Sequence, residues 1–164
     1  MTDATSGNGN GSRPEGVPTL NALAQYVKDF SFENPNAPRS LGPQEKAPNI
    51  AFQVNVNAQQ LAPTDYEVSI SLDAKAGEGA ELLFQLDLDY AGVFRLSNIP
   101  SEQIHPIVMI ECPRLLFPFV RQIVADATKN GGYPPLYIDP IDFLALYQQK
   151  ATQEQTDQNI ASAN

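Results

Sequence analysis

The sequence predicts an α+β fold, in which a four-stranded antiparallel sheet carries helices on one face. Two observations lead to this class. Apolar and polar residues alternate with a period of two in four segments of the first hundred residues, and helical spacing follows them. Strands that come first and helices that come after are typical of an antiparallel sheet covered on one side. A chain of 164 residues corresponds to one domain.

The two ends have compositions typical of disorder. Residues 1–18 are mainly Gly, Asn, Ser, Thr and Pro, and residues 150–164 are mostly polar. Such segments bury too little apolar surface to offset the entropy lost on ordering. We therefore expect a disordered N-terminal tail over 1–18, a folded domain over 19–149 and a disordered C-terminal tail over 150–164.

The first strand is expected over 26–33, where the period-two alternation begins. Just before it, the apolar residues of 20–27 have helical spacing, which favours a short helix. The connection over 33–48 carries four prolines and is long for a compact domain; loops of this kind are often functional.

Three further strands are expected over 50–57, 66–72 and 81–90. Gly77 and Gly79 mark the hairpin tip between the last two. Residues 92–96 continue the alternation beyond a glycine bend, so the fourth strand is expected to extend through them.

The helical part begins with a short helix or turn over 101–110, followed by a long helix over 113–129. A last helix is expected to follow, with Asp139 as its cap, Pro140 at its first position and its end at about Gln149. Pro118 is expected to strain or kink the long helix. The first turns of this helix are apolar nearly all round, and such a helix is buried on more than one side. One side is expected to lie on the sheet and the other against a second subunit, although a thick core helix within a monomer also fits. The residues assigned to the oligomer interface are Leu115, Leu116, Phe119, Val120 and Ile123.

Charge and cysteine content exclude several classes of protein. The formal net charge is −9 and the pI is about 4.4, which argues against nucleic acid and anionic membrane surfaces as partners. One cysteine excludes an internal disulfide. No signal peptide and no apolar run long enough to span a membrane is present in the sequence. We therefore expect a cytoplasmic protein that does not insert into membranes.

The sequence contains no motif of a nucleophilic, nucleotide-binding or metal-dependent enzyme. His105 beside Pro106 is best interpreted as a packing or helix-end histidine. Cys112 lies at a helix start, where a thiol pKa can fall, but a structural role is favoured because no base accompanies it. We expect no enzyme, no cofactor and no metal site.

Two surface features are more informative. Asp29 and Glu33 share one strand face about 13 Å apart, and Asp87 and Asp89 share another with a spacing of about 6.6 Å. If strands one and four are neighbours, these four carboxylates form one acidic patch; an ordinary solvated strand face is the alternative. The apolar residues of 50–54 adjoin the proline-rich connection and indicate either the wall of an apolar groove or simple core packing.

Five motifs together resemble the SecB family of protein-export chaperones. They are Tyr26–Pro38, Tyr66–Val68, Gly92–Phe94, Cys112–Arg121 and Gly132–Leu136. The resemblance implies a four-stranded antiparallel sheet and a homotetramer built as a dimer of dimers, with the long helices between paired sheets. It also implies a protein that holds unfolded precursor proteins in the cytoplasm and passes them to the SecA motor.

The resemblance further implies two sets of binding residues. The SecA-binding residues are Asp29, Glu33, Gln85 and Asp87, and their partner is a basic tail of SecA that carries zinc. The client-binding residues are Ile50, Phe52, Val54 and Leu86. Where relatives often carry an aromatic residue in the proline-rich connection, this chain has Leu41 and Glu45.

Three hypotheses of different classes follow. The first is the export chaperone. The second is an oligomeric adaptor that binds a basic partner through the acids but does not hold unfolded chains. The third is a small-molecule carrier or hydrolase, which would need a deep pocket with His105 or Cys112 at its base.

Overall fold

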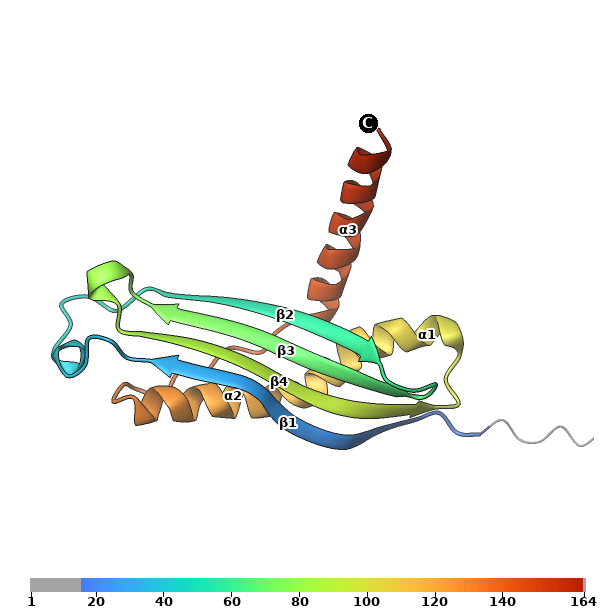
Figure 1. The fold of residues 1–164 in the computed structure, drawn as a ribbon, viewed down its shortest axis with the longest axis horizontal. Helices are drawn as coiled ribbons and strands as arrows, with labels where there is room; N and C mark the ends of the chain where they lie inside the picture. Colours follow the sequence, from blue (N-terminus) through green and yellow to red (C-terminus); the bar gives the residue numbers. More distant parts are fainter. Residues whose placement is uncertain (1–15, 164) are drawn as a thin grey trace, which may run out of the picture.

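The computed structural model describes residues 16–163, and its centre is one four-stranded antiparallel sheet. The strands are β1 Thr19–Glu33, β2 Ile50–Gln60, β3 Asp65–Ala76 and β4 Phe84–Ser97. Their order across the sheet is β1-β4-β3-β2, so β4 and β3 are interior and β1 and β2 are edges. Figure 1 shows the sheet as a long twisted layer with α2 along one face. The predicted fold class is confirmed.

The start of β1 differs from the prediction. The strand begins at Thr19, so the short helix expected over 20–27 is wrong. Two register shifts against β4, between Ala22 and Ala24 and between Val27 and Asp29, explain the difference. Each irregularity displaces the apolar positions by one residue, and the resulting spacing imitates a helical one.

The other strands are longer than predicted at their ends. β4 runs through residues 92–96, as expected, whereas residues 79–81 form a short turn of 3₁₀ helix before it. Gly77 and Gly79 have φ values of 81° and 55° at the tip. Backbone of this kind favours glycine, which explains the pair.

Three helices follow the sheet, and α2 covers it. They are α1 Ser101–Pro106, α2 Cys112–Asn130 and α3 Phe143–Ser162, with a π-helical turn, Ile107–Glu111, between the first two. Pro113 lies in the first turn of α2, where a missing N–H costs nothing. Pro118 lies within the helix, which continues through it.

The C-terminal prediction requires correction. Residues 151–162 continue α3 and are not a disordered tail. The Asp142 side chain caps the helix by accepting from the N–H of Ala145 at 3.0 Å. No proline or glycine interrupts the chain after it, and Gln, Glu, Lys and Ala favour helix even without burial. In Figure 1 this helix points away from the sheet.

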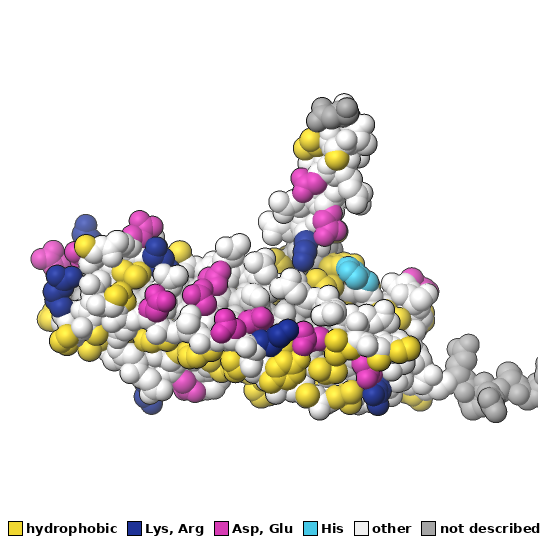
Figure 2. All heavy atoms as spheres, in the orientation of Figure 1, with side chains coloured by type: hydrophobic (Ala, Val, Ile, Leu, Met, Phe, Trp, Pro, Cys, Tyr) yellow, Lys and Arg dark blue, Asp and Glu magenta, His cyan; other side chains and the backbone are white. Residues whose placement is uncertain are grey.

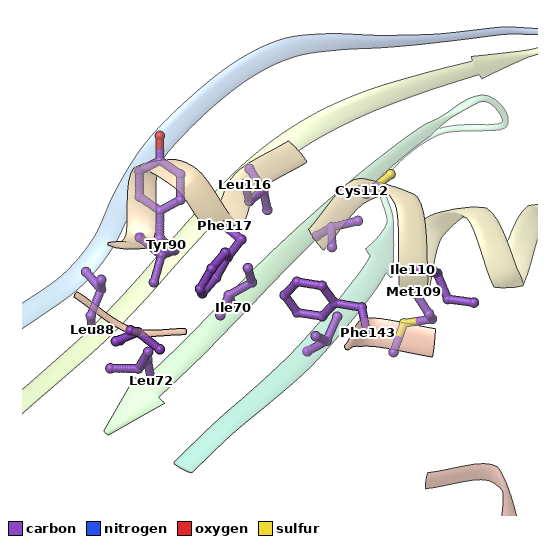
Figure 3. Close-up of a cluster of buried hydrophobic side chains, with 14 of the residues drawn as sticks. Ile70, Leu72, Leu88, Tyr90, Met109, Ile110, Cys112, Leu116, Phe117 and Phe143 are labelled. Atoms are coloured by element: carbon purple, nitrogen blue, oxygen red, sulfur yellow. The ribbon is translucent and has the colours of Figure 1, made fainter. Parts of the chain in front are cut away.

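The core lies between α2 and the even-numbered face of β3 and β4. Figure 3 shows Ile70, Leu72 and Leu88 of the sheet near Leu116 and Phe117 of α2. Phe143, at the start of α3, closes the same cluster and is 2% exposed. Its ring meets Phe117 edge-on at 6.0 Å.

The N-terminal tail expected over 1–18 falls, for 1–15, outside the described residues. Over 16–163, no helix is both long enough and apolar enough to cross a membrane.

Candidate functional site: the two faces of the sheet

The predicted acidic residues lie together on the sheet face opposite α2. In the β1–β4 register Asp29 pairs with Asp89, and Glu33 pairs with Gln85. Asp87 lies between them, opposite Ser31, whose hydroxyl donates to its carboxylate at 3.4 Å. Paired residues of antiparallel strands point to the same side. These carboxylates therefore share one face, and Figure 2 shows acidic side chains across it.

Asp73 extends this acidic face to β3. It is the direct register partner of Asp87. The pKa of Asp73 is raised, first by a hydrogen bond that its carboxyl shares with Asp87 and then by desolvation and by the charge of Asp87. The charge of Asp87 disfavours ionisation of Asp73, because like charges on adjacent strands repel each other. A cationic partner would relieve this repulsion.

One carboxylate on the same face is already paired within the chain. Glu67 accepts from the Lys28 ammonium at 2.8 Å and also from the Tyr26 hydroxyl. These two bonds lower the pKa of Glu67. The bond to Glu67, together with burial, raises the pKa of Tyr26 to about 12. Glu67 is therefore satisfied internally and lies at the end of the acidic face rather than within it.

The predicted client-binding residues lie on the opposite face. Phe52 of β2, Ala74 of β3 and Leu86 of β4 form one row across the sheet. Phe52 is 55% exposed and its strand neighbour Ile50 is 36% exposed, whereas Leu86 is fully buried. Leu86, which was expected to bind client, is therefore a core residue, because β4 is interior and its even positions pack in the core.

An apolar groove of about 370 Å³ lies beside Ile50. The proline-rich connection forms one wall with Leu41, and Tyr133 and its neighbouring prolines form the other. The Tyr133 hydroxyl lies 2.6 Å from the side-chain oxygen of Asn34 and 2.9 Å from the carbonyl oxygen of Leu83, which ties the two segments to the sheet. Of the two interpretations of this segment, the structure has the apolar groove, and Leu41 lies in its wall.

The sequence pattern did not predict this second wall. Residues 132–136 carry no periodicity and were interpreted only as an extended linker. The contacts of Tyr133 join positions 50 to 99 residues apart, which local patterns do not report. The only signal was the motif Gly132–Leu136 itself.

The residues predicted for the oligomer interface divide into two groups. Leu115 and Phe119 are 47% and 48% exposed on the outer side of α2. Leu116 and Val120 are fully buried against the subunit's own sheet, so they are corrected to core residues. Ile123 is half-buried between the two groups.

An exposed apolar seam continues from α2 to the edge strand. Phe119 stacks on Tyr90 of β4 with ring centroids 6.1 Å apart. On β1, Val27 pairs with Tyr90 and Phe30 pairs with Leu88, and both are more than 40% exposed. A seam of this kind on two adjacent elements is typical of a surface covered by another subunit.

The two candidate catalytic residues have ordinary structural surroundings. Burial, helped by the charge of Glu111, raises the pKa of the Cys112 thiol to about 12, so the depressed pKa considered for a helix start is wrong. The ring Nδ1 of His105 lies 3.0 Å from the Tyr147 hydroxyl. Among residues 16–163, no three His, Cys, Asp or Glu side chains gather as metal ligands would.

Comparison with known proteins agrees with this geometry. Residues 14–154 match the family model described as preprotein translocase subunit SecB. The protein-export protein SecB of Beijerinckia indica is 68% identical over 144 residues, which cover 88% of this chain and 90% of the relative. That of Methylocella silvestris is 64% identical over 148 residues, covering 90% and 92%.

A solved structure agrees at the level of the fold. The SecB-like chaperone of Mycobacterium tuberculosis, in complex with a peptide from an antitoxin, is 16% identical, with a TM-score of 0.55. The match covers 74% of this chain and 90% of that one. Because the family model spans most of the sequence, this chain belongs to the SecB family of protein-export chaperones.

Proposed function

We propose that this protein, an export chaperone by its family, binds unfolded precursor proteins in the cytoplasm and delivers them to the SecA motor. The observation that carries the proposal is that the two faces of the sheet present different kinds of side chain. One presents paired carboxylates, and the other presents exposed apolar side chains at its edge. The proposal includes no covalent step, no nucleotide hydrolysis by the chaperone and no cofactor.

Clients bind through apolar burial along the edge of β2. Ile50, Phe52 and Val54 form the rim of the client site, and Leu86 supports it from within the core. Each square ångström of apolar client surface removed from water contributes about 25 cal/mol, whatever the client sequence. Folded proteins hide such segments, so the site selects for chains that fold slowly.

SecA docks on the acidic face. Asp29, Glu33 and Asp87 attract lysine and arginine side chains of the basic tail of SecA, and Gln85 makes a weaker contact between them. Complementary charge speeds encounter and fixes the docking register. The zinc ion of this contact belongs to SecA.

The working form is a homotetramer, a dimer of dimers. The exposed side of α2, with Leu115, Phe119 and Ile123, packs against other subunits, as the apolar seam suggests. Several weak client sites on one assembly raise the avidity for a long chain, while each site still releases quickly.

The docking proposal is tested by reversing two charges. Asp29→Lys with Glu33→Lys is expected to lower affinity for SecA at least tenfold, since each close charge pair contributes on the order of 1.5 kcal/mol or more. The measurement is a calorimetric titration with SecA. The matched control is Glu78→Lys with Glu81→Lys, which reverses two exposed charges at the hairpin tip.

The client proposal has its own measurement on the same proteins. The unmodified protein, the Asp29→Lys/Glu33→Lys variant and the control variant are expected to delay the refolding of an unfolded precursor equally. Unchanged SecA affinity in the first variant contradicts the docking face. Failure of the unmodified protein to delay refolding supports the adaptor alternative instead.

A further inference from the structure

The proline-rich connection between β1 and β2 is tied to the opposite wall of the apolar groove by one pair of hydroxyl groups. Its 3₁₀ turn, Arg39–Leu41, places Ser40 in a buried position with 8% of its surface exposed. The Ser40 hydroxyl lies 2.8 Å from the Tyr133 hydroxyl. Over residues 16–163, no other side-chain hydrogen bond joins this turn to the loop over 132–136. The two hydroxyls are therefore the hydrogen-bonded link between the walls.

The Tyr133 hydroxyl meets more acceptors than it has hydrogens. It carries one hydrogen and lies 2.6 Å from the Asn34 side-chain oxygen and 2.9 Å from the Leu83 carbonyl oxygen. The Asn34 amide nitrogen donates to the Gly131 carbonyl at 2.9 Å, which leaves its oxygen as the acceptor. Both acceptors compete for the Tyr133 hydrogen, so the Ser40 hydroxyl has to donate its own hydrogen to the Tyr133 oxygen. This chain of donors joins the connection to the loop and the loop to the sheet.

The ring of Tyr133 is held independently of its hydroxyl. It packs against Phe84 with ring centroids 5.3 Å apart, and Phe84 stacks on Phe32 at 5.8 Å. The walls also touch at Gly132, where φ is 94° and a Cβ atom would lie 2.8 Å from a methyl carbon of Leu41. Replacing Tyr133 by Phe therefore removes the hydroxyl contacts and leaves the packing in place.

The position of the turn decides whether the groove exists before a client arrives. The groove of about 370 Å³ is lined by Leu41 and Pro48 of the connection on one side and by Tyr133 and Leu136 on the other. A wall that moves freely in the unbound protein has to be ordered when an apolar segment enters, and this ordering weakens binding. A wall that is already fixed avoids that cost.

We propose that Tyr133 is a positioning residue for client binding, because its hydroxyl holds the turn of the proline-rich connection in place and so forms the groove in advance. The inference rests on the proposed client-holding function and adds a role for a polar atom that acts through the wall. The effect on the client passes through Leu41, which lies next to Ser40 in the turn. The occupant of the groove is an unfolded polypeptide.

The test is a calorimetric titration of the full chain with a model protein kept unfolded by reduction and alkylation. Tyr133→Phe is expected to weaken the client affinity at least threefold, since the loosened wall has to be ordered on binding. The number of clients bound per assembly is expected to stay unchanged, because the packing of the ring on Phe84 is retained. Tyr137→Phe is the matched control: this side chain is 57% exposed, and its loss of a hydroxyl is expected to leave the affinity unchanged.

A second measurement addresses the pair of hydroxyls. Ser40→Ala removes the same link from the side of the connection and is expected to weaken the affinity to a similar degree. The double variant Ser40→Ala with Tyr133→Phe is expected to bind no more weakly than Tyr133→Phe alone, because two residues that share one interaction are not additive. The Leu41 amide donates to the Pro38 carbonyl at 3.0 Å, and its hydrogen exchange is expected to be at least threefold faster in both single variants.

The outcomes separate this inference from the function on which it rests. Unchanged affinity in Tyr133→Phe, or unchanged exchange of the Leu41 amide, overturns the positioning role but leaves client holding intact. A smaller number of bound clients at unchanged affinity also overturns it, since that result reports partial unfolding rather than a loosened wall. Equal weakening by Tyr137→Phe, or additive effects in the double variant, overturns the link between the two hydroxyls. An unmodified protein that binds no client overturns both proposals.

Discussion

The Glu67 side chain shows how one residue joins strands that are not neighbours. Glu67 lies on β3, and its partners Tyr26 and Lys28 lie on β1, with β4 between them. Ala91 of β4 is the register partner of Tyr26, and its small side chain is fully buried. The contact therefore passes over the small side chain of Ala91 and links the edge strand β1 to the interior strand β3.

This link is expected to depend on pH. The folded-state pKa of Glu67 lies below its ordinary value of 4.5, so the stabilisation is fully present above pH 4.5 and is lost as the pH falls through the lowered pKa. A double-mutant cycle of Tyr26→Phe and Glu67→Gln is expected to give a coupling of about 1 kcal/mol at pH 7. The measurement is urea unfolding at fixed protein concentration. A coupling that stays constant below pH 4.5 contradicts this account.

At the scale of the elements, the sequence predicted the strands and the faces of their side chains wherever apolar and polar residues alternate regularly. The acids of β1 and β4 share a face because both strands alternate without interruption beyond Asp29. The start of β1 was mistaken for a helix because its irregularities break the period. The burial of Leu86, Leu116 and Val120 depends on which strands are interior and how α2 is rotated, and local spacing reports neither.

In α3 the sequence pattern predicted disorder where the structure has a helix. Its C-terminal part has no apolar face, so the pattern predicted disorder, yet intrinsic helix propensity continues the helix through Ser162. This part carries helical structure without tertiary support. Only its first turns, from Phe143, contribute to the core.

A truncation and a point substitution separate these two parts. Ending the chain after Ala151 removes side chains that are all exposed over the described residues 152–163, and it is expected to change the free energy of unfolding by less than about 0.5 kcal/mol. Phe143→Ala is expected to cost about 3–5 kcal/mol, because it leaves a cavity beside Phe117. Chemical denaturation followed by circular dichroism gives both values. A truncated chain as unstable as Phe143→Ala contradicts this division of α3.

At the scale of the whole molecule, the apolar seam on α2 and β1 makes the assembly testable. Leu115→Asp with Phe119→Asp places two charges where burial is proposed, at a cost of several kcal/mol per subunit. Light scattering at micromolar concentration is expected to show a species smaller than the proposed tetramer. Leu144→Asp, on α3, also puts a charge on an exposed leucine and is expected to keep the full mass. An unchanged mass in the double variant contradicts the proposed interface.

The sheet is a single layer of strands, and its two faces point in opposite directions. A client bound along the edge of β2 would not block SecA from reaching the carboxylates on the opposite face. Client binding and SecA binding are then compatible, and either can come first. The protein can therefore bind SecA while a client is still bound, and transfer of the client requires no prior release into solution.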